Sequence, residues 1–293
     1  MLGRFLTGSF ESEYTATRSF KRERAAVAQG GARTRPALEY RAAYLEHRRH
    51  GASTSAVSVN EEFLKDRVDT LFGTTFNERD GRVVPTTADV ALKDGAVKID
   101  ATFLYTDLAG SAKLSSVCPW STTAKIIRAF LDCSTRLIVK HGGAIRSFDG
   151  DRVMGVFIGD AKNSNAAICG REIHWTVRKV ISPKARAKFN SIKNNDIEIR
   201  NCSGIDTGEV RAVRSGIRDN NDLIWVGKAA SFSAKLSDVR DTFYHTYISS
   251  RVYNNLNKKA KQDGDGNNAW SSTQFSFAGE SETVYKSNHW KRP

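Results

Sequence analysis

Two aspartates stand where strand-like runs of the sequence meet turns. Asp107 ends the apolar run 101–106, and Asp151 lies in the turn of a predicted hairpin over 144–157. If the run and the hairpin are neighbours in one sheet, both carboxylates meet at one edge of it. Two close carboxylates repel each other unless a proton or a cation neutralises them, and divalent cations do this in many active sites. The alternative is that each aspartate only caps a strand or a turn, where this residue is common.

A glycine and a serine follow the first aspartate at the start of a new element. Gly110 and Ser111 open a predicted short helix, whose first backbone N–H groups could face a phosphate. No GxxxxGK[ST] motif occurs in the chain, which excludes a P-loop ATPase. The phosphate chemistry, if present, therefore depends on the carboxylates and their cations.

The elements that would position these residues follow a recognisable order. Apolar spacing, glycines and turn residues predict alternating strands and helices. We expect strand 99–107, helix 121–141, hairpin 144–157, helix 161–181 ending before Pro183, strands 197–205 and 209–213, a loop over 214–222, and helix 229–239. The order β-α-β-β-α-β predicts an α+β fold with a ferredoxin-like core, an antiparallel sheet with helices on one face.

Three segments are expected along the chain. Residues 1–55 form a basic extension with few apolar residues, which we expect to be mobile apart from some helix around 38–49. Residues 56–98 form a helix over 58–72, with Asn60 as N-cap, followed by a connecting loop. Residues 99–293 form the main domain with its C-terminal strands.

Composition limits the class of protein. The chain has 293 residues, 40% of them apolar, and a net charge of +13, which favours an anionic partner. It has no apolar run long enough to span a membrane and no secretory leader, so we expect a soluble, cytoplasmic protein without a membrane partner. Four separated cysteines lack metal-binding spacing, and the DGDGNN segment at 263–268 lacks the calcium-loop glycine and glutamate.

Four ordered motifs resemble the class III nucleotide cyclases. They are LYTDLAGSAKLS (104–115), FDGDRVMGVF (148–157), GIDTGEV (204–210) and WVGKAASFSAKLS (225–237). GRVVP (81–85), IRSFDGDRVMGVF (145–157) and NDLIWVGKAA (221–230) are similar to the pyrimidine cyclases of the bacterial Pycsar antiphage system. The resemblance covers residues 99 to about 250.

This resemblance implies a reaction and a site. In such enzymes the ribose 3′-hydroxyl of a nucleoside triphosphate attacks the α-phosphorus and pyrophosphate leaves. By resemblance, Asp107 and Asp151 bind two manganese ions per site, with magnesium as the alternative, and the backbone carbonyl of Leu108 completes one site. Tyr105, Gly110 and Ser111 would bind the substrate, although Tyr105 could equally be a core tyrosine. The resemblance also implies a homodimer whose active sites combine groups from both subunits.

The sequence departs from the family pattern at two places. Purine cyclases read the base with a lysine and an aspartate, where this chain has Arg146-Ser147 and Leu223-Ile224-Trp225. The bulky Trp225 suits a one-ring base, but no single side chain decides between uracil and cytosine. From the family resemblance alone we expect UTP to be converted to 3′,5′-cyclic UMP, with cytidine left open. The usual transition-state Asn and Arg are replaced by Ser231 and Lys235, one helical turn apart. Lysine supplies charge without the bidentate fork of arginine.

Two other interpretations stay open at this stage. The Ser231 replacement also fits a catalytically impaired homologue that only binds nucleotide. The charge of +13 fits a nucleic-acid-binding protein, but the second motif lacks the RNP1 pattern of an RNA-binding domain, so we expect no stable nucleic acid partner. The Pycsar resemblance further implies a separate effector that responds to the cyclic product during antiphage defence.

Overall fold

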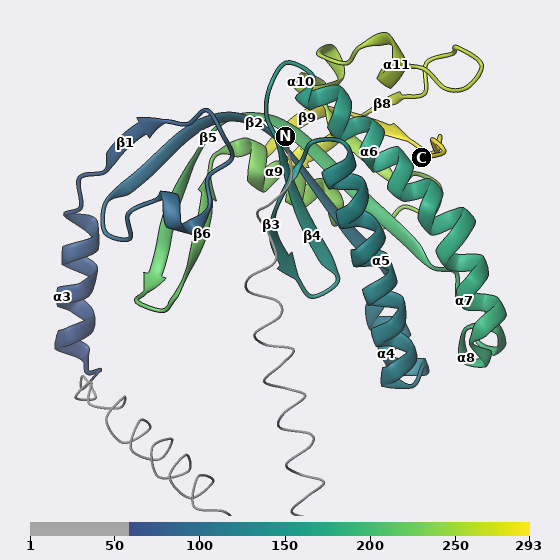
Figure 1. Ribbon diagram of the computed structural model, residues 1–293, viewed down its shortest axis with the longest axis horizontal. Coiled ribbons are helices and arrows are strands. Elements are labelled where there is room, and N and C mark those ends of the chain that lie inside the picture. The colour runs from purple at the N-terminus through teal and green to yellow at the C-terminus, as the bar shows by residue number, and fades with distance from the viewer. Residues whose placement is uncertain (1–58) are drawn as a thin grey trace, which may run out of the picture. The chain divides into compact units, whose positions relative to one another are not determined.

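The computed structural model of the chain describes residues 59–293 (Figure 1). The predictions for residues 1–55 lie outside the described residues. The chain divides into two compact units at Gly73 and Thr74. In the first unit, helix α3 (Glu61–Phe72) begins where the Asn60 side chain accepts a hydrogen bond from the Phe63 backbone N–H, as predicted. None of its residues is buried.

The second unit is built on a mixed sheet in which four consecutive strands, beginning at the edge strand β3, form the predicted core (Figure 1). The core consists of β2 (Gly95–Ala109), α5 (Trp120–Lys140), β3 (Ala144–Asp149), β4 (Arg152–Phe157), α6 (Lys162–Thr176) and β5 (Arg200–Ile217). The strands lie in the order β3-β4-β2-β5, and every neighbouring pair among them is antiparallel. The expected ferredoxin-like α+β core is confirmed.

Further elements extend this core on both sides. Beyond β5 the sheet continues through β7 (Thr246–Ser249), β9 (Glu280–Ser287) and β8 (Ser271–Phe277). Strand β1 (Asn77–Asp80) pairs in parallel with β2, and β6 (Asn220–Val226) pairs with the distal part of β5. The short helices are α4 (Ser111–Val117), α7 (Ser182–Lys188), α8 (Asn190–Asn194), α10 (Ser250–Asn254) and α11 (Lys258–Lys261), and a 3₁₀ turn spans Thr87–Asp89.

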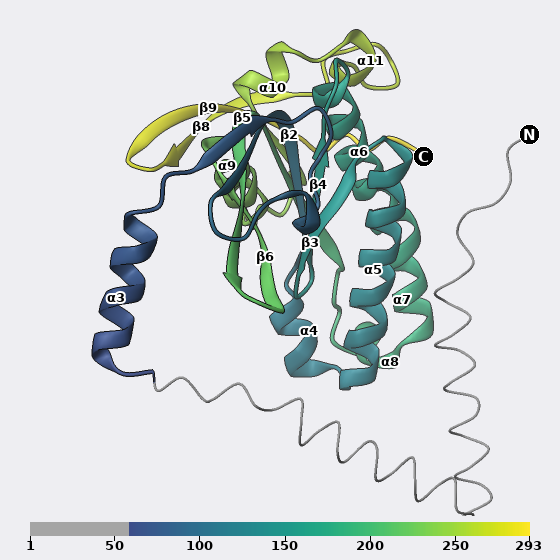
Figure 2. The same cartoon turned by 60° about the vertical axis from the view of Figure 1, so that its left-hand side comes forward.

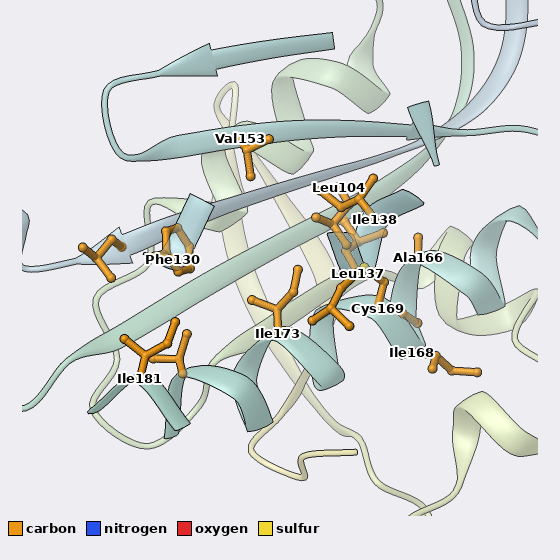
Figure 3. Packing of buried hydrophobic residues seen from close by; sticks show 14 of the residues in the cluster. Leu104, Phe130, Leu137, Ile138, Val153, Ala166, Ile168, Cys169, Ile173 and Ile181 are labelled. Atoms are coloured by element: carbon orange, nitrogen blue, oxygen red, sulfur yellow. The ribbon is translucent and has the colours of Figure 1, made fainter. Parts of the chain in front are cut away.

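The largest hydrophobic cluster lies between the sheet and helices α5 and α6 (Figures 2 and 3). Leu104 of β2, Ile138 of α5 and Ile173 of α6 are at most 1% exposed and belong to this cluster. Strand side chains alternate between the two faces of a sheet, so the odd-numbered residues of β2 must face the other way. Asp107 and Tyr105 are therefore on the face away from α5 and α6.

Helix α9 (Lys228–Ser237) packs on that second face. Phe103 of β2 and Ala229 of α9 share one smaller cluster, and Cys202 of β5 and Leu236 of α9 share another. Gly204 allows the contact, because a Cβ there would lie 2.2 Å from the backbone oxygen of Ser233. The helix therefore rests directly on the backbone of β5.

Several element boundaries differ from the sequence predictions. The predicted strands 197–205 and 209–213 are one strand, β5, because its pairing with β2 continues through Gly208 without a shift in register. The predicted loop 214–222 is the end of β5, a turn and the start of β6. The helix expected to end before Pro183 continues through the π-helical turn Val177–Ile181 into α7, with Pro183 in the first turn of α7.

Three smaller predictions have clear outcomes. The segment 73–98, expected as a loop, contains β1, the 3₁₀ turn and the start of β2. The DGDGNN segment is a turn, since the Asp263 side chain accepts hydrogen bonds from the backbone N–H groups of Asp265 and Asn267. All four cysteines are free thiols.

Candidate active site

Asp107 lies inside strand β2 rather than at its end. The strand continues to Ala109, so the prediction that the strand stops at Asp107 is wrong. Asp107 stands opposite Arg152 of β4 on one side and Cys202 of β5 on the other. Hydrogen-bonded neighbours on both sides fix its backbone, and only 4% of the residue is exposed. The carboxylate is thus held on a rigid element, which suits a group that must keep an exact position.

Asp151 reaches the same place from a tight hairpin. Asp149 pairs with Arg152, which leaves Gly150 and Asp151 as a two-residue loop. Gly150 has φ +60° at the first loop position, the arrangement of a type II′ turn. One carboxylate oxygen of Asp151, Oδ2, is buried and has no hydrogen-bond partner among the described residues. A buried carboxylate oxygen without a partner is costly and points to a missing ligand.

The two carboxylates act on each other electrostatically. Burial raises the pKa of Asp107, and the negative charge of Asp151 raises it further. The guanidinium groups of Arg240 and Arg152 oppose both effects. The structure therefore brings together the two aspartates that the sequence singled out, in a partly desolvated setting that also holds two arginines.

The residues present fit divalent cations with oxygen ligands. Carboxylate and carbonyl oxygens are the ligands preferred by magnesium and manganese, and such ions commonly take only one or two carboxylates plus substrate phosphates. Among the described residues no group of three or more His, Cys, Asp or Glu side chains could hold a metal. The side chain of Leu108 is buried in the large cluster, so only its backbone could contribute a ligand.

Tyr105 lies two residues before Asp107 on the same face of β2. It stands opposite Met154 and Gly204 and is partly buried against the smaller cluster of that face. Burial raises its pKa, while the positive charge of Arg152 lowers it. The phenol is thus a neutral hydrogen-bond donor near the carboxylates. It is also partly exposed, so that a substrate could contact it.

Gly110 and Ser111 join β2 to helix α4 as predicted. Gly110 has φ +84°, a left-handed conformation that glycine adopts without strain, and no atom lies within 4 Å of a Cβ placed there. Ser111 is the first residue of α4. Gly110, three residues after Asp107, therefore has open space beside its Cα.

Ser231 and Lys235 lie on helix α9 and make no contact with the two aspartates. The Ser231 hydroxyl is exposed and bonds to the backbone oxygens of Gly227 and Lys228, at 3.3 and 3.2 Å. Lys235 forms no ion pair with any residue that the structure describes. The single subunit does not assemble these two residues with Asp107 and Asp151.

Two arginines at the site were not predicted from the sequence. Arg240, in the segment after α9, donates a hydrogen bond from Nη2 to Asp107 Oδ2 at 2.5 Å. Arg152 Nη2 lies 4.0 Å from the same oxygen and donates to Asp238 Oδ1 at 2.8 Å. Arg152 is next to Asp151 and could have been considered for that reason. For Arg240, 133 residues from Asp107, no sequence signal existed.

The middle of β2 carries an aromatic contact. Phe103 and Trp225 pack edge to face, with ring centroids 5.4 Å apart. Arg146 is held by hydrogen bonds from its guanidinium to the backbone oxygens of Ile145 and Val84, at 2.7 and 2.8 Å. Of these residues, Arg146 and Trp225 are the ones predicted from the sequence to stand where purine cyclases read the base.

The third motif, GIDTGEV, has a supporting function. Gly204 lets the backbone of α9 pack directly against β5. Asp206 is fully buried and pairs with Arg251, whose Nη2 donates to Asp206 Oδ2 at 2.5 Å. Arg251 Nε also donates to the Thr207 backbone oxygen at 3.1 Å. These contacts fix the middle of β5 to the start of α10.

Comparison with known proteins decides the family. No family model matches the chain. A uridylate cyclase of Rhodovulum sp. (strain MB263) is 43% identical over 238 residues, which is 81% of this chain and 99% of the relative. A uridylate cyclase of Xanthomonas perforans is 36% identical over 77% of this chain and 96% of the relative. This chain belongs to the uridylate cyclase family.

Solved structures agree with the fold of this uridylate cyclase family member. The guanylyl cyclase Cya2 superposes with a TM-score of 0.55 at 17% identity, covering 67% of this chain and 95% of that one. The adenylyl cyclase CyaB from P. aeruginosa gives the same TM-score at 18% identity, covering 67% and 97%. The resemblance to class III and Pycsar cyclases is confirmed, and the chain is a nucleotide cyclase. Across residues 59–293, no helix combines the length and apolarity that a membrane crossing needs.

Proposed function

We propose that this cyclase converts UTP into 3′,5′-cyclic UMP and pyrophosphate, with two divalent cations, manganese in the first place, held by Asp107 and Asp151. The observation that carries the proposal is the convergence of these carboxylates, one with a buried oxygen that lacks a partner, in a chain 43% identical to a uridylate cyclase. The relatives' names support uridine over cytidine.

The bonds of the reaction balance simply. A bond forms between the 3′-oxygen and the α-phosphorus, the bond from the α-phosphorus to the oxygen shared with the β-phosphorus breaks, and the hydroxyl proton passes to solvent. The cations, when bound, lower the pKa of the attacking hydroxyl and neutralise charge on the phosphates. The protein positions these groups on the paired strand β2 and on the two-residue loop of the β3–β4 hairpin.

The remaining groups are proposed to come from a second subunit. Ser231 and Lys235 lie on α9, and the Ser231 hydroxyl bonds to backbone oxygens of its own helix rather than to Asp107. A two-fold dimer would bring the α9 helix of each subunit to the carboxylates of the other, as an isologous contact allows. There the Lys235 ammonium would stabilise negative charge on the α-phosphate in the transition state.

The test is a product assay with each of the four ribonucleoside triphosphates, in manganese and separately in magnesium. We expect cyclic UMP from UTP, and loss of at least about 10²-fold in kcat for Asp107→Asn or Asp151→Asn, because each removes charge that must balance the cations. Asp100→Asn is the matched control, an exposed aspartate of the same strand that pairs with Lys162. No cyclic product from any nucleotide refutes the activity, and a purine or cytidine product refutes the base choice.

The cellular part of the proposal is separate from the chemistry. In the cytoplasm the cyclic product would act on an independent effector in defence against phage. Bacteria carrying the cyclase with its natural effector should resist infection, and Asp151→Asn should remove that resistance. Equal resistance with the variant contradicts a second-messenger role and leaves the reaction itself untouched.

A further inference from the structure

Arg240 occupies the carboxylate on which cation binding depends. Its Nη2 donates to Asp107 Oδ2 at 2.5 Å, and its Nη1 donates to the backbone oxygens of Ser237 and Val239 at 2.9 and 3.3 Å. The guanidinium thus bridges the C-terminal end of α9 and the strand β2. A charge-assisted hydrogen bond of this kind satisfies one lone pair of a buried carboxylate.

A divalent cation and this guanidinium compete for the same charge. Asp107 and Asp151 have a combined charge of −2 when ionised, and Arg240 neutralises part of it. Any cation that approaches Asp107 Oδ2 meets a positive group already in contact with that oxygen. Because the Asp107 side chain is only 6% exposed, solvent screens this repulsion weakly.

Arg152 differs from Arg240 in a way that separates their roles. Arg152 donates to Asp238 at 2.8 Å, lies on a paired strand, and has a side chain that is 25% exposed. The Arg240 side chain is 48% exposed and follows the helix in an irregular segment. Because Arg240 lies outside the paired strands, its side chain can turn away from Asp107 once its hydrogen bonds are given up, whereas the backbone of Arg152 is held in β4.

The released guanidinium has a suitable new partner. Arginine binds phosphate through two parallel N–H donors, and the substrate brings a triphosphate to the same carboxylates. Movement from Asp107 to a phosphate oxygen would exchange one charge-assisted contact for another, and further N–H bonds to phosphate would offset the loss of the two backbone contacts of Nη1. The cations would then take the vacated lone pair.

We propose that Arg240 is a counter-ion for Asp107 in the cation-free enzyme and transfers to the substrate phosphates when nucleotide and cations bind. Arg240 is a positioning residue that makes cation loading depend on nucleotide, so that the empty enzyme does not hold tightly bound manganese. This inference rests on the proposed function of Asp107 and Asp151.

Arg240→Gln tests the exchange, because glutamine removes the charge and retains a hydrogen-bond donor. We expect manganese, measured by calorimetry without nucleotide, to bind about tenfold more tightly to the variant, a difference of about 1.4 kcal/mol. A non-hydrolysable UTP analogue, measured with saturating manganese, should bind about tenfold more weakly. Arg211→Gln is the matched control, since Arg211 is also about 40% exposed and pairs with Glu78 and Glu209 at the other end of the β2–β5 ladder.

Manganese affinity that is unchanged or weaker in Arg240→Gln overturns the proposal, provided that circular dichroism shows the variant to be folded. Unchanged affinity for the analogue overturns the transfer to phosphate. The variant Asp107→Asn distinguishes failure of the Arg240 proposal from failure of the proposed function. If wild-type protein binds manganese and Asp107→Asn does not, the cation site stands whatever Arg240 does. If the folded wild type binds none with nucleotide present, both fail.

Discussion

Gly204 of β5 lies directly beneath Ser233 of α9, with no room for a side chain between them. A Cβ on Gly204 would lie 2.2 Å from the Ser233 backbone oxygen and 2.4 Å from the Ser237 nitrogen. Both obstructing atoms belong to the helix backbone, so they cannot move aside as a flexible side chain could. The height of α9 above the sheet, and with it the positions of Ser231 and Lys235, is set by this missing side chain.

Gly204→Ala should therefore destabilise the protein and displace α9. We expect a loss of at least about 3 kcal/mol in the free energy of unfolding, measured with urea, because the added methyl group overpacks against backbone. Gly264→Ala is the control, since no atom lies within 4 Å of a Cβ at Gly264 and its φ is not in the left-handed region. Equal stabilities of the two variants would contradict the close contact.

A shared active site predicts complementation between two inactive variants. Asp107→Asn lacks the carboxylate and Lys235→Ala lacks the α9 cation, so neither homodimer has a complete site. After mixing and subunit exchange, half the dimers are mixed and half of the sites in these are intact. Activity should return to about one quarter of wild type, as expected for a two-fold dimer. Recovery would be absent if each chain carried a complete site.

Ser231 is expected to limit the rate. Its hydroxyl already bonds to carbonyl oxygens of its own helix, so it is a poor donor to a phosphate. Ser231→Asn supplies a longer amide donor and should raise kcat by about tenfold, part of the effect that such donors have in other enzymes. Ser231→Ala should change kcat less than about threefold for the same reason. A large loss in Ser231→Ala would show instead that the hydroxyl acts on the substrate.

Two stacked histidines predict a loss of stability in mild acid. His174 and His245 are buried with ring centroids 4.2 Å apart, and burial together with the charge of His245 lowers the pKa of His174 to about 3. The unfolded chain has a histidine pKa of about 6.5, so it binds more protons than the folded chain below that pH. Stability should fall as the pH drops from about 6.5 toward 3.

For His174 the expected loss is about 2 kcal/mol between pH 7 and pH 5, measured by urea unfolding at both values. His174→Phe should reduce the difference between the two pH values by that amount. His289→Gln, which replaces a half-exposed histidine, is the control and should leave the difference unchanged. An identical pH response in all three proteins would contradict the buried neutral pair.

The core of the fold and the meeting of the two aspartates could be predicted because both depend on local patterns. The apolar run in β2 and the Gly150 turn place Asp107 on one strand and Asp151 in the hairpin beside it in any ferredoxin-like sheet. The long strand β5 was divided wrongly because Gly208 suggests a break. Pairing with β2 on one side overrides that local preference.

The arginine contact at the site could not be predicted. Arg240 follows a helix and belongs to no periodic pattern, and its partner Asp107 is reached only after α9 has folded onto β5. The π-helical turn before Pro183 could not be predicted either. The sequence shows a proline that normally ends a helix, but it does not show that the preceding π-helical turn lets the chain continue into α7.

The unbroken ladder between β2 and β5 also limits how the family could change its substrate. Phe103, against Trp225, and Asp107 are separated by four residues of paired strand, about 13 Å along the sheet. An insertion or deletion of one residue between them would turn Asp107 into the layer occupied by α5 and α6. The distance between the Phe103–Trp225 pair and the carboxylate therefore cannot change one residue at a time, and side chains along this strand can vary only by substitution on a frame of constant length.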